Sequence, residues 1–178
     1  MSATIAVRKG GKVSIATDSQ WTAGGEKHFR FQPKIEQKNG VIISSGPQAG
    51  YDLALKSEVF NFIKAEGDSW PVKWSLHCLG ADDKTAISRL GSMQRDGALP
   101  ILIVWKGRIF EAKANGAIFE TDDDIRANGA GGNYALGAAR ALYDRMSSPT
   151  TIAKEAIRIA CTYSTVCDLP IVCKTMRI

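Results

Sequence analysis

A hairpin at the start of the chain constrains the fold more than any other stretch. Residues 1–18 read MSATIAVRKGGKVSIATD, and apolar side chains alternate with other residues on both sides of Gly10-Gly11. Two adjacent glycines can both take positive φ, which suits the two-residue turn of a β-hairpin. A turn there places Asp18 opposite Ala3 and Ser19 opposite Ser2. The sequence therefore predicts a carboxylate beside the beginning of the chain.

This placement suggests a chemical use for Ser2. A serine at the N-terminus carries a hydroxyl and a free α-amine on one residue, and an amine with a pKa near ~8 can take the hydroxyl proton at neutral pH. The amine is free only after Met1 is removed, and the small second residue suits methionine aminopeptidases. The alternative interpretation of this stretch is an edge hairpin with a frayed end.

A second hairpin is predicted around Asn39-Gly40, the strongest short hairpin signal in the chain. Its register places Lys34 at a strand end, opposite Ser45. The strand then opens into Gly46-Pro47-Gln48-Ala49-Gly50, a turn that can point backbone N–H groups at a developing oxyanion. A lysine exposed at a strand end is the alternative interpretation.

The rest of the chain predicts two antiparallel sheets with helices packed outside them, because βαβ alternation is missing. Residues 21–30 are expected to form a loop, and residues 72–79 a short strand or a helix. Lys106-Gly107 marks a third hairpin, followed by a short strand over residues 117–120. Helices are expected over about residues 50–65 and 82–94, after the glycine-rich stretch 128–133 and after Ser148-Pro149, with a last strand over 171–176. The whole chain, 1–178, is expected to be one α+β domain.

Composition narrows the class of protein. The net charge is +5, but the basic residues are scattered and no aromatic-basic block indicates nucleic-acid binding. The longest apolar run, residues 101–105, is too short to span a membrane, and charges interrupt the N-terminus where a signal peptide would be apolar. The four cysteines have no CxxC spacing and there are only two histidines, which argues against zinc. A cytoplasmic protein with buried thiols is expected.

Several stretches together resemble the proteasome β-subunit family, most closely its bacterial HslV branch. ATIAVRKGGKVSIATDSQ resembles the first hairpin of a mature subunit, and PKIEQKNG its lysine strand and Asn-Gly turn. NGAGGNYALGAARAL and SPTTIAKEAIRIA resemble its glycine loop and two following helices, in the same order. The resemblance implies a four-layer αββα sandwich of the N-terminal-nucleophile type.

The family also implies roles for the residues above. Ser2 falls at the position of the N-terminal threonine nucleophile, and Asp18 and Lys34 fall at the family's aspartate and lysine. Ser2 would attack a peptide carbonyl with its own amine as base, and Lys34, held cationic beside Asp18, would lower the pKa of the hydroxyl. A backbone N–H in the turn that contains Gly46 and Gln48 would stabilise the oxyanion.

The chain departs from the family's pattern at three places. Serine replaces threonine as the nucleophile, Ala130 stands at a serine that supports the amine, and Pro47-Gln48-Ala49 occupies the glycine-rich oxyanion turn. Asp168 aligns with an acidic residue that holds the amine in many relatives and would compensate for Ala130. HslV also binds a monovalent cation, such as Na⁺, through backbone carbonyls, which here belong to Cys161, Ser164 and Cys167.

The assembly implied by the resemblance is a homo-oligomer of stacked hexameric or heptameric rings. An AAA+ unfoldase would feed unfolded polypeptide into its chamber. Two other functions stay open from the sequence. One is a ring-forming homologue with weak or no catalysis, favoured by Ala130 and Gln48. The other is a nucleotide-binding protein, suggested by Gly129-x-Gly131 before a helix, although Tyr134 replaces the third glycine.

Overall fold

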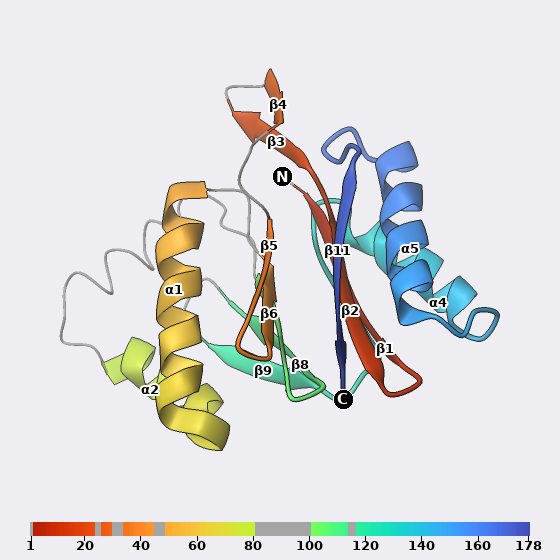
Figure 1. The fold of residues 1–178 in the computed structure, drawn as a ribbon. Helices are drawn as coiled ribbons and strands as arrows, with labels where there is room; N and C mark the ends of the chain where they lie inside the picture. The colour runs from red at the N-terminus through yellow and green to blue at the C-terminus, as the bar shows by residue number, and fades with distance from the viewer. Residues whose placement is uncertain (1, 24–25, 30–33, 45–48, 81–100, 114–116) are drawn as a thin grey trace.

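The computed structural model describes residues 2–23, 26–29, 34–44, 49–80, 101–113 and 117–178. These residues form four layers, with two helices on each outer side and two β-sheets between them (Figure 1). The predicted α+β architecture of two antiparallel sheets flanked by helices is confirmed.

The first sheet contains the beginning and the end of the described chain. Its strand order is β10-β1-β2-β11, and every pair is antiparallel. The bounds are β1 Ala3–Lys9, β2 Lys12–Asp18, β10 Ile125–Gly129 and β11 Ile171–Arg177. Helices α4 (Gly132–Tyr143) and α5 (Pro149–Tyr163) cover its outer face (Figure 1).

The second sheet has five strands in the order β5-β6-β7-β8-β9. The bounds are β5 Ile35–Lys38, β6 Val41–Ser44, β7 Ile101–Trp105, β8 Arg108–Ala112 and β9 Ile118–Thr121. Helix α1 (Ala49–Glu66), a 3-10 turn (Gly67–Ser69) and helix α2 (Trp70–Gly80) lie on its outer side (Figure 1).

Three apolar clusters hold the layers together. Ile5 and Val7 point to the helical side of the first sheet and pack with α4 and α5, whereas Val13 and Ile15 point to the other side. That inner cluster joins the sheets and includes Ile35, Ile42, Leu102, Val104 and Ile109. The third cluster packs α1 and α2 on the second sheet through Trp70, Trp74 and Phe110 among others. Burial of the inner cluster stabilises the packing of the two sheets against each other, and burial of the other two clusters stabilises the packing of the helices on the sheets.

Turn chemistry sets the predicted registers. Gly10 and Gly11 have φ of 57° and 70°, and Asn39 and Gly40 have φ of 50° and 73°, as a primed two-residue turn requires. Thr4 pairs with Thr17, and Ile35 pairs with Ser44. Both registers agree with those predicted from the glycine and Asn-Gly turns.

The fold differs from the sequence predictions in three strands, β3, β4 and β10. Residues 21–30 were expected to be a loop, but β3 (Gln20–Ala23) and β4 (Glu26–Phe29) form a two-stranded ribbon. Strand β10 was also not expected, because its polar residues show little apolar alternation and its pairing with β1 joins distant parts of the chain. Residues 72–79 are helical, in α2. The helix expected over 82–94 lies outside the described residues.

The described helices were also compared with the requirements of a membrane span. None of them combines enough length with enough apolar character to cross a bilayer.

Candidate active site

Three buried side chains meet at one end of the first sheet. The Lys34 ammonium donates to Ser2 Oγ over 2.9 Å and to Asp18 Oδ2 over 3.1 Å. Ser2, Asp18 and Lys34 are 3%, 0% and 2% exposed. The lysine is therefore not a surface residue at a strand end, and the structure brings together the three residues that the hairpins place at strand ends.

Asp18 is held by the backbone on either side of it. Its Oδ1 accepts a hydrogen bond from Ala3 N at 2.9 Å, and its Oδ2 accepts one from Gln20 N at 2.9 Å. Lys34 also donates to the Gln20 carbonyl at 2.5 Å. Hydrogen bonds to charged groups are stronger than neutral ones. The carboxylate and the ammonium therefore have fixed positions relative to the first residues of β1.

Burial and charge have opposite effects on Lys34. Burial lowers the pKa of Lys34 below its ordinary value of 10.5, and Asp18 partly reverses this through its charge and its hydrogen bond. Burial also raises the pKa of the nearby Cys161 thiol to about 12 and raises that of Cys167. Near neutral pH the two thiols are therefore uncharged, and Asp18 forms an ion pair with Lys34.

The glycine-rich turn after β10 fixes the backbone of Ser2. Ala3 pairs with Gly129, and Gly131 N donates to the Ser2 carbonyl at 3.2 Å. Gly129 has φ of +90°, and a Cβ there would lie 2.2 Å from Ser2 O. Only glycine allows so close an approach at this dihedral. Because these glycines contact the Ser2 backbone and β10 is antiparallel to β1, the dinucleotide-binding interpretation, which needs a parallel strand, is wrong for this turn.

Gly129→Ala tests this packing. We expect it to destabilise the fold by about 1–3 kcal/mol from backbone strain alone, and to lower turnover because the new Cβ must displace Ser2. Gly137→Ala is the matched control, since a Cβ at Gly137 meets nothing within 4 Å and the site is in helix α4. Thermal unfolding of both variants measures the difference. Equal melting temperatures would contradict the role given to Gly129.

Asp168 reaches the site through its backbone. Its N–H donates to Asp18 Oδ2 over a long 3.5 Å, its carbonyl accepts from Ser19 N at 3.1 Å, and its Oδ1 accepts from Leu169 N at 2.8 Å. The segment after α5 therefore closes over Asp18. That the Asp168 carboxylate holds the Ser2 amine stays a prediction.

The remaining candidate residues divide into two groups. Gly46 and Gln48, predicted for the oxyanion turn, lie outside the described residues. Cys161, Ser164 and Cys167 lie at and beyond the end of α5, where Ser164 is the C-cap and its carbonyl accepts from Cys167 N at 3.4 Å. Within the described residues, no group of three or more His, Cys, Asp or Glu side chains could hold a metal ion.

Sequence reasoning missed two backbone groups of the site. The Gln20 carbonyl that accepts from Lys34 comes from β3, which was predicted to be a loop, and Gly131 N was not linked to Ser2. Polar residues directly after Asp18 gave no apolar pattern to follow. The two adjacent glycines at 131–132 were the available signal for a close backbone approach.

Comparisons with known proteins identify relatives over nearly the whole chain. A curated protein from Caldicellulosiruptor saccharolyticus, named ATP-dependent protease subunit HslV, is 32% identical over 169 residues, which cover 90% of this chain and 91% of the relative. A Bartonella quintana protein of the same name is also 32% identical over 169 residues, covering 90% and 82%. No protein-family model matches the chain.

Solved structures support the architecture. Eukaryotic HslV from Trypanosoma brucei superposes with a TM-score of 0.82 at 22% identity and covers 99% of both chains. BPH from Thiobacillus denitrificans, solved in complex with epoxomicin, has a TM-score of 0.72 at 20% identity and covers 98% of both chains. At these identities the structural likeness shows a shared fold.

Proposed function

This chain belongs to the HslV family, whose curated members are named ATP-dependent protease subunits, and from this premise we propose that it is a peptidase of the N-terminal-nucleophile type with Ser2 as nucleophile. The observation that carries the proposal is the 2.9 Å hydrogen bond from Lys34 Nζ to Ser2 Oγ, inside a buried cluster with Asp18. A hairpin with only a structural role does not require a buried lysine and a buried aspartate beside Ser2, whereas buried ionisable groups are common at active sites.

The proposed reaction begins with removal of Met1, which frees the Ser2 amine. The amine takes the hydroxyl proton while Ser2 Oγ forms a bond to the peptide carbonyl carbon, and the carbonyl oxygen becomes an oxyanion. The intermediate expels the leaving amine, which receives the proton from the Ser2 ammonium. Water then attacks the acyl ester by the same proton route and releases the second product.

Lys34 acts electrostatically in this scheme. Because its ammonium donates to Ser2 Oγ, the hydroxyl proton must point elsewhere and is available to the amine. The fixed positive charge stabilises the alkoxide character that develops on Oγ as the proton leaves. Asp18 keeps Lys34 cationic and in place. We further propose that Asp168 orients the amine and that N–H groups of the turn with Gly46 and Gln48 stabilise the oxyanion.

The pH dependence of kcat/KM follows from the protonation of the Ser2 α-amine and of Lys34. We expect an acid limb near the ordinary α-amine pKa of about 8, and an alkaline limb below 10.5, because burial lowers the pKa of Lys34 and its charge is lost above that pKa. Since Asp18 raises the pKa of Lys34, Asp18→Asn should move the alkaline limb to lower pH. An alkaline limb that stays in place would contradict the role of Lys34.

The assembly is proposed from the relatives. Their printed name describes a subunit of an ATP-dependent protease. We propose that this chain forms stacked hexameric or heptameric rings in the cytoplasm, with active sites inside, and that an AAA+ ATPase supplies unfolded polypeptide. Size-exclusion chromatography with light scattering tests the ring, and a monomer at micromolar concentration would argue against it.

We also propose that the end of α5 binds a monovalent cation through the carbonyls of Cys161, Ser164 and Cys167. The chemistry of the donors fits, because hard cations prefer oxygen and Cys161 lies in the last turn of α5, where carbonyls have no intrahelical N–H partner; the Ser164 carbonyl, which accepts from Cys167 N, has a second lone pair for a cation. The cation would stabilise the segment leading to Asp168. We expect a higher melting temperature in NaCl than in N-methylglucamine chloride of equal ionic strength, and equal values would remove the site.

The decisive test of the peptidase is the intact mass of the protein before and after incubation with a peptide epoxyketone, a reagent that needs both the hydroxyl and the free amine of an N-terminal nucleophile. Loss of Met1 and one inhibitor adduct is the expected result. Retained Met1 without an adduct would instead indicate the non-catalytic ring. Loss of Met1 without an adduct would indicate that the amine is free but the site is inactive, with Ala130 or the turn at 46–49 as the cause.

A further inference from the structure

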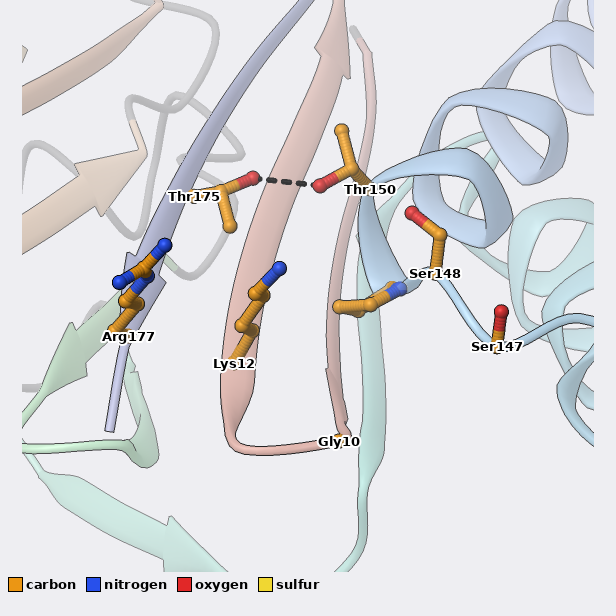
Figure 2. Close-up of a pocket in the computed structure, with 8 residues that line it drawn as sticks. Gly10, Lys12, Ser147, Ser148, Thr150, Thr175 and Arg177 are labelled. Carbon is orange, nitrogen blue, oxygen red and sulfur yellow. Dashed lines mark hydrogen bonds between the residues drawn. The ribbon is translucent and has the colours of Figure 1, made fainter.

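The turn between β1 and β2 lies at the end of the first sheet that is far from the N-terminus (Figure 1), and a pocket that the peptidase mechanism does not use lies beside this turn. The pocket has a volume of about 380 Å³. It is lined by the hairpin turn and β2, the end of β11 and the start of α5: Gly10, Lys12, Ser147, Ser148, Pro149, Thr150, Thr175 and Arg177. Figure 2 shows Lys12 and Arg177 on adjacent strands, with the serines and Thr150 across from them.

Two cations stand directly opposite each other in this pocket. Lys12 of β2 pairs in register with Arg177 of β11, so their side chains leave the sheet on the same face. Like charges in such a pair repel each other. Within the described part of the chain, neither forms an ion pair, and none of the residues that line the pocket is acidic. Two cations therefore lie side by side without an ion-pair partner among the described residues.

A third cation in the same row of paired residues, Lys9, has different contacts. Lys9 of β1 pairs with Lys12 from the other side, but its ammonium donates to the Tyr143 carbonyl and lies 4.2 Å from the centre of the Tyr143 ring. Lys9 is therefore engaged by α4. Lys12 and Arg177 are the two cations that face the pocket.

The hydroxyl groups that line the pocket are of two kinds: the threonines bond to one another and to Ser14, whereas the Ser148 hydroxyl can donate to a ligand. Thr150 and Thr175 form a hydrogen-bonded triangle with the buried Ser14, with sides of 2.8 to 3.0 Å, and their mutual bond is drawn in Figure 2. Ser148 Oγ accepts from Thr151 N as the cap of α5, which leaves its O–H to donate. The positive end of the α5 dipole adds to the field of the two cations.

We propose that this pocket binds a small phosphate-bearing anion. Lys12 and Arg177 supply charge and charge-assisted hydrogen bonds, and Ser148 supplies a neutral donor. None of the described residues that line the pocket is aromatic, so among them no side chain could stack on a nucleobase, and the phosphate group itself is the recognised part. Bound anion would tie β2, β11 and the start of α5 together, and it would relieve the repulsion between Lys12 and Arg177.

The test measures melting temperature and calorimetric Kd with the full-length protein, and it requires no peptidase activity. The probes are inorganic phosphate, pyrophosphate and glycerol 3-phosphate, each at low millimolar concentration, with NaCl added so that the ionic strength is the same in every sample. At such concentrations, the non-specific stabilisation that these anions cause by their exclusion from protein surfaces is small. At a hundredfold excess over Kd, mass action raises the melting temperature by about 5–10 °C. If phosphate or pyrophosphate binds best, the natural ligand of the pocket is a free inorganic anion. If glycerol 3-phosphate binds best, the natural ligand is a phosphorylated metabolite.

Three variants make the test specific. Lys12→Gln and Arg177→Gln should weaken Kd at least about tenfold, because each removes a charge-assisted hydrogen bond. Lys174→Gln is the matched control, since Lys174 is exposed on the same strand and opposite Ile15, on the other face of the sheet. In anion-free buffer, Lys12→Gln should raise the melting temperature by removing the repulsion. Equal shifts in all four proteins, no shift in the wild type, or a lower melting temperature for Lys12→Gln would overturn the proposal.

Discussion

Ser2→Ala is expected to reduce peptide hydrolysis by roughly 10³-fold or more, because no other atom can take the place of Oγ as nucleophile. The fold should survive, since the variant removes one hydrogen bond while Lys34 keeps its bonds to Asp18 and to the Gln20 carbonyl. The loss of stability should stay near 1–2 kcal/mol. Turnover of a fluorogenic peptide and thermal unfolding measure the two effects separately.

Two further variants bracket this result. Ser19→Ala removes a hydroxyl at the end of the same hairpin, where Ser19 Oγ donates to the Pro170 carbonyl, and it should leave turnover nearly unchanged. Ser2→Thr keeps the nucleophile and adds a methyl group that restricts χ1, so it should retain activity and form the epoxyketone adduct. If Ser2→Ala hydrolyses peptides as fast as the wild type, Ser2 is not the nucleophile.

Lys34→Met is expected to damage both stability and activity. It leaves the Asp18 carboxylate, which is 0% exposed, without its cation. Removing one partner of a buried ion pair typically costs about 3–5 kcal/mol. Loss of the charge beside Ser2 Oγ should lower turnover by roughly 10²–10⁴-fold, the range of a proton-transfer contribution. Chemical denaturation and steady-state kinetics test the two parts.

Lys56→Met is the matched control for that variant. Lys56 is as buried as Lys34, at 2% exposed, and it donates to Glu36 Oε1 at 2.6 Å. The Glu36 side chain is 33% exposed, so water can solvate its carboxylate after the lysine is removed. The control should cost less stability and should keep turnover. An equal loss of turnover in both lysine variants would mean that Lys34 acts only through the fold.

Local turn chemistry made much of the first half of the site predictable. Gly10-Gly11 and Asn39-Gly40 determine the registers of their own hairpins, so Asp18 and Lys34 could be placed at strand ends from the sequence. The family resemblance then brought these strand ends together. Burial of Lys34 could not be read from the hairpin, because it depends on packing of the second sheet against the first.

The other half of the site depends on long-range pairing. Strand β10 lies beside β1 because Ala3 pairs with Gly129, and no local pattern encodes that pairing. The turn after β10 then holds the Ser2 carbonyl through Gly131 N. Likewise, the family resemblance gave Asp168 the role of holding the Ser2 amine. The contacts of its backbone with Asp18 and Ser19 could not be predicted, because they form only when distant parts of the chain come together.

The distribution of these contacts along the chain has a consequence for biosynthesis. Ser2 and Asp18 leave the ribosome early, but Gly131 and the segment at Asp168, which complete their surroundings, leave it late. In the proposed mechanism, a nascent chain therefore carries Ser2 for most of translation without the backbone groups that position it. For the proposed peptidase, this order means that the surroundings of Ser2 are completed only when nearly the whole polypeptide has been made, so the site would become active only after synthesis of the chain is almost finished.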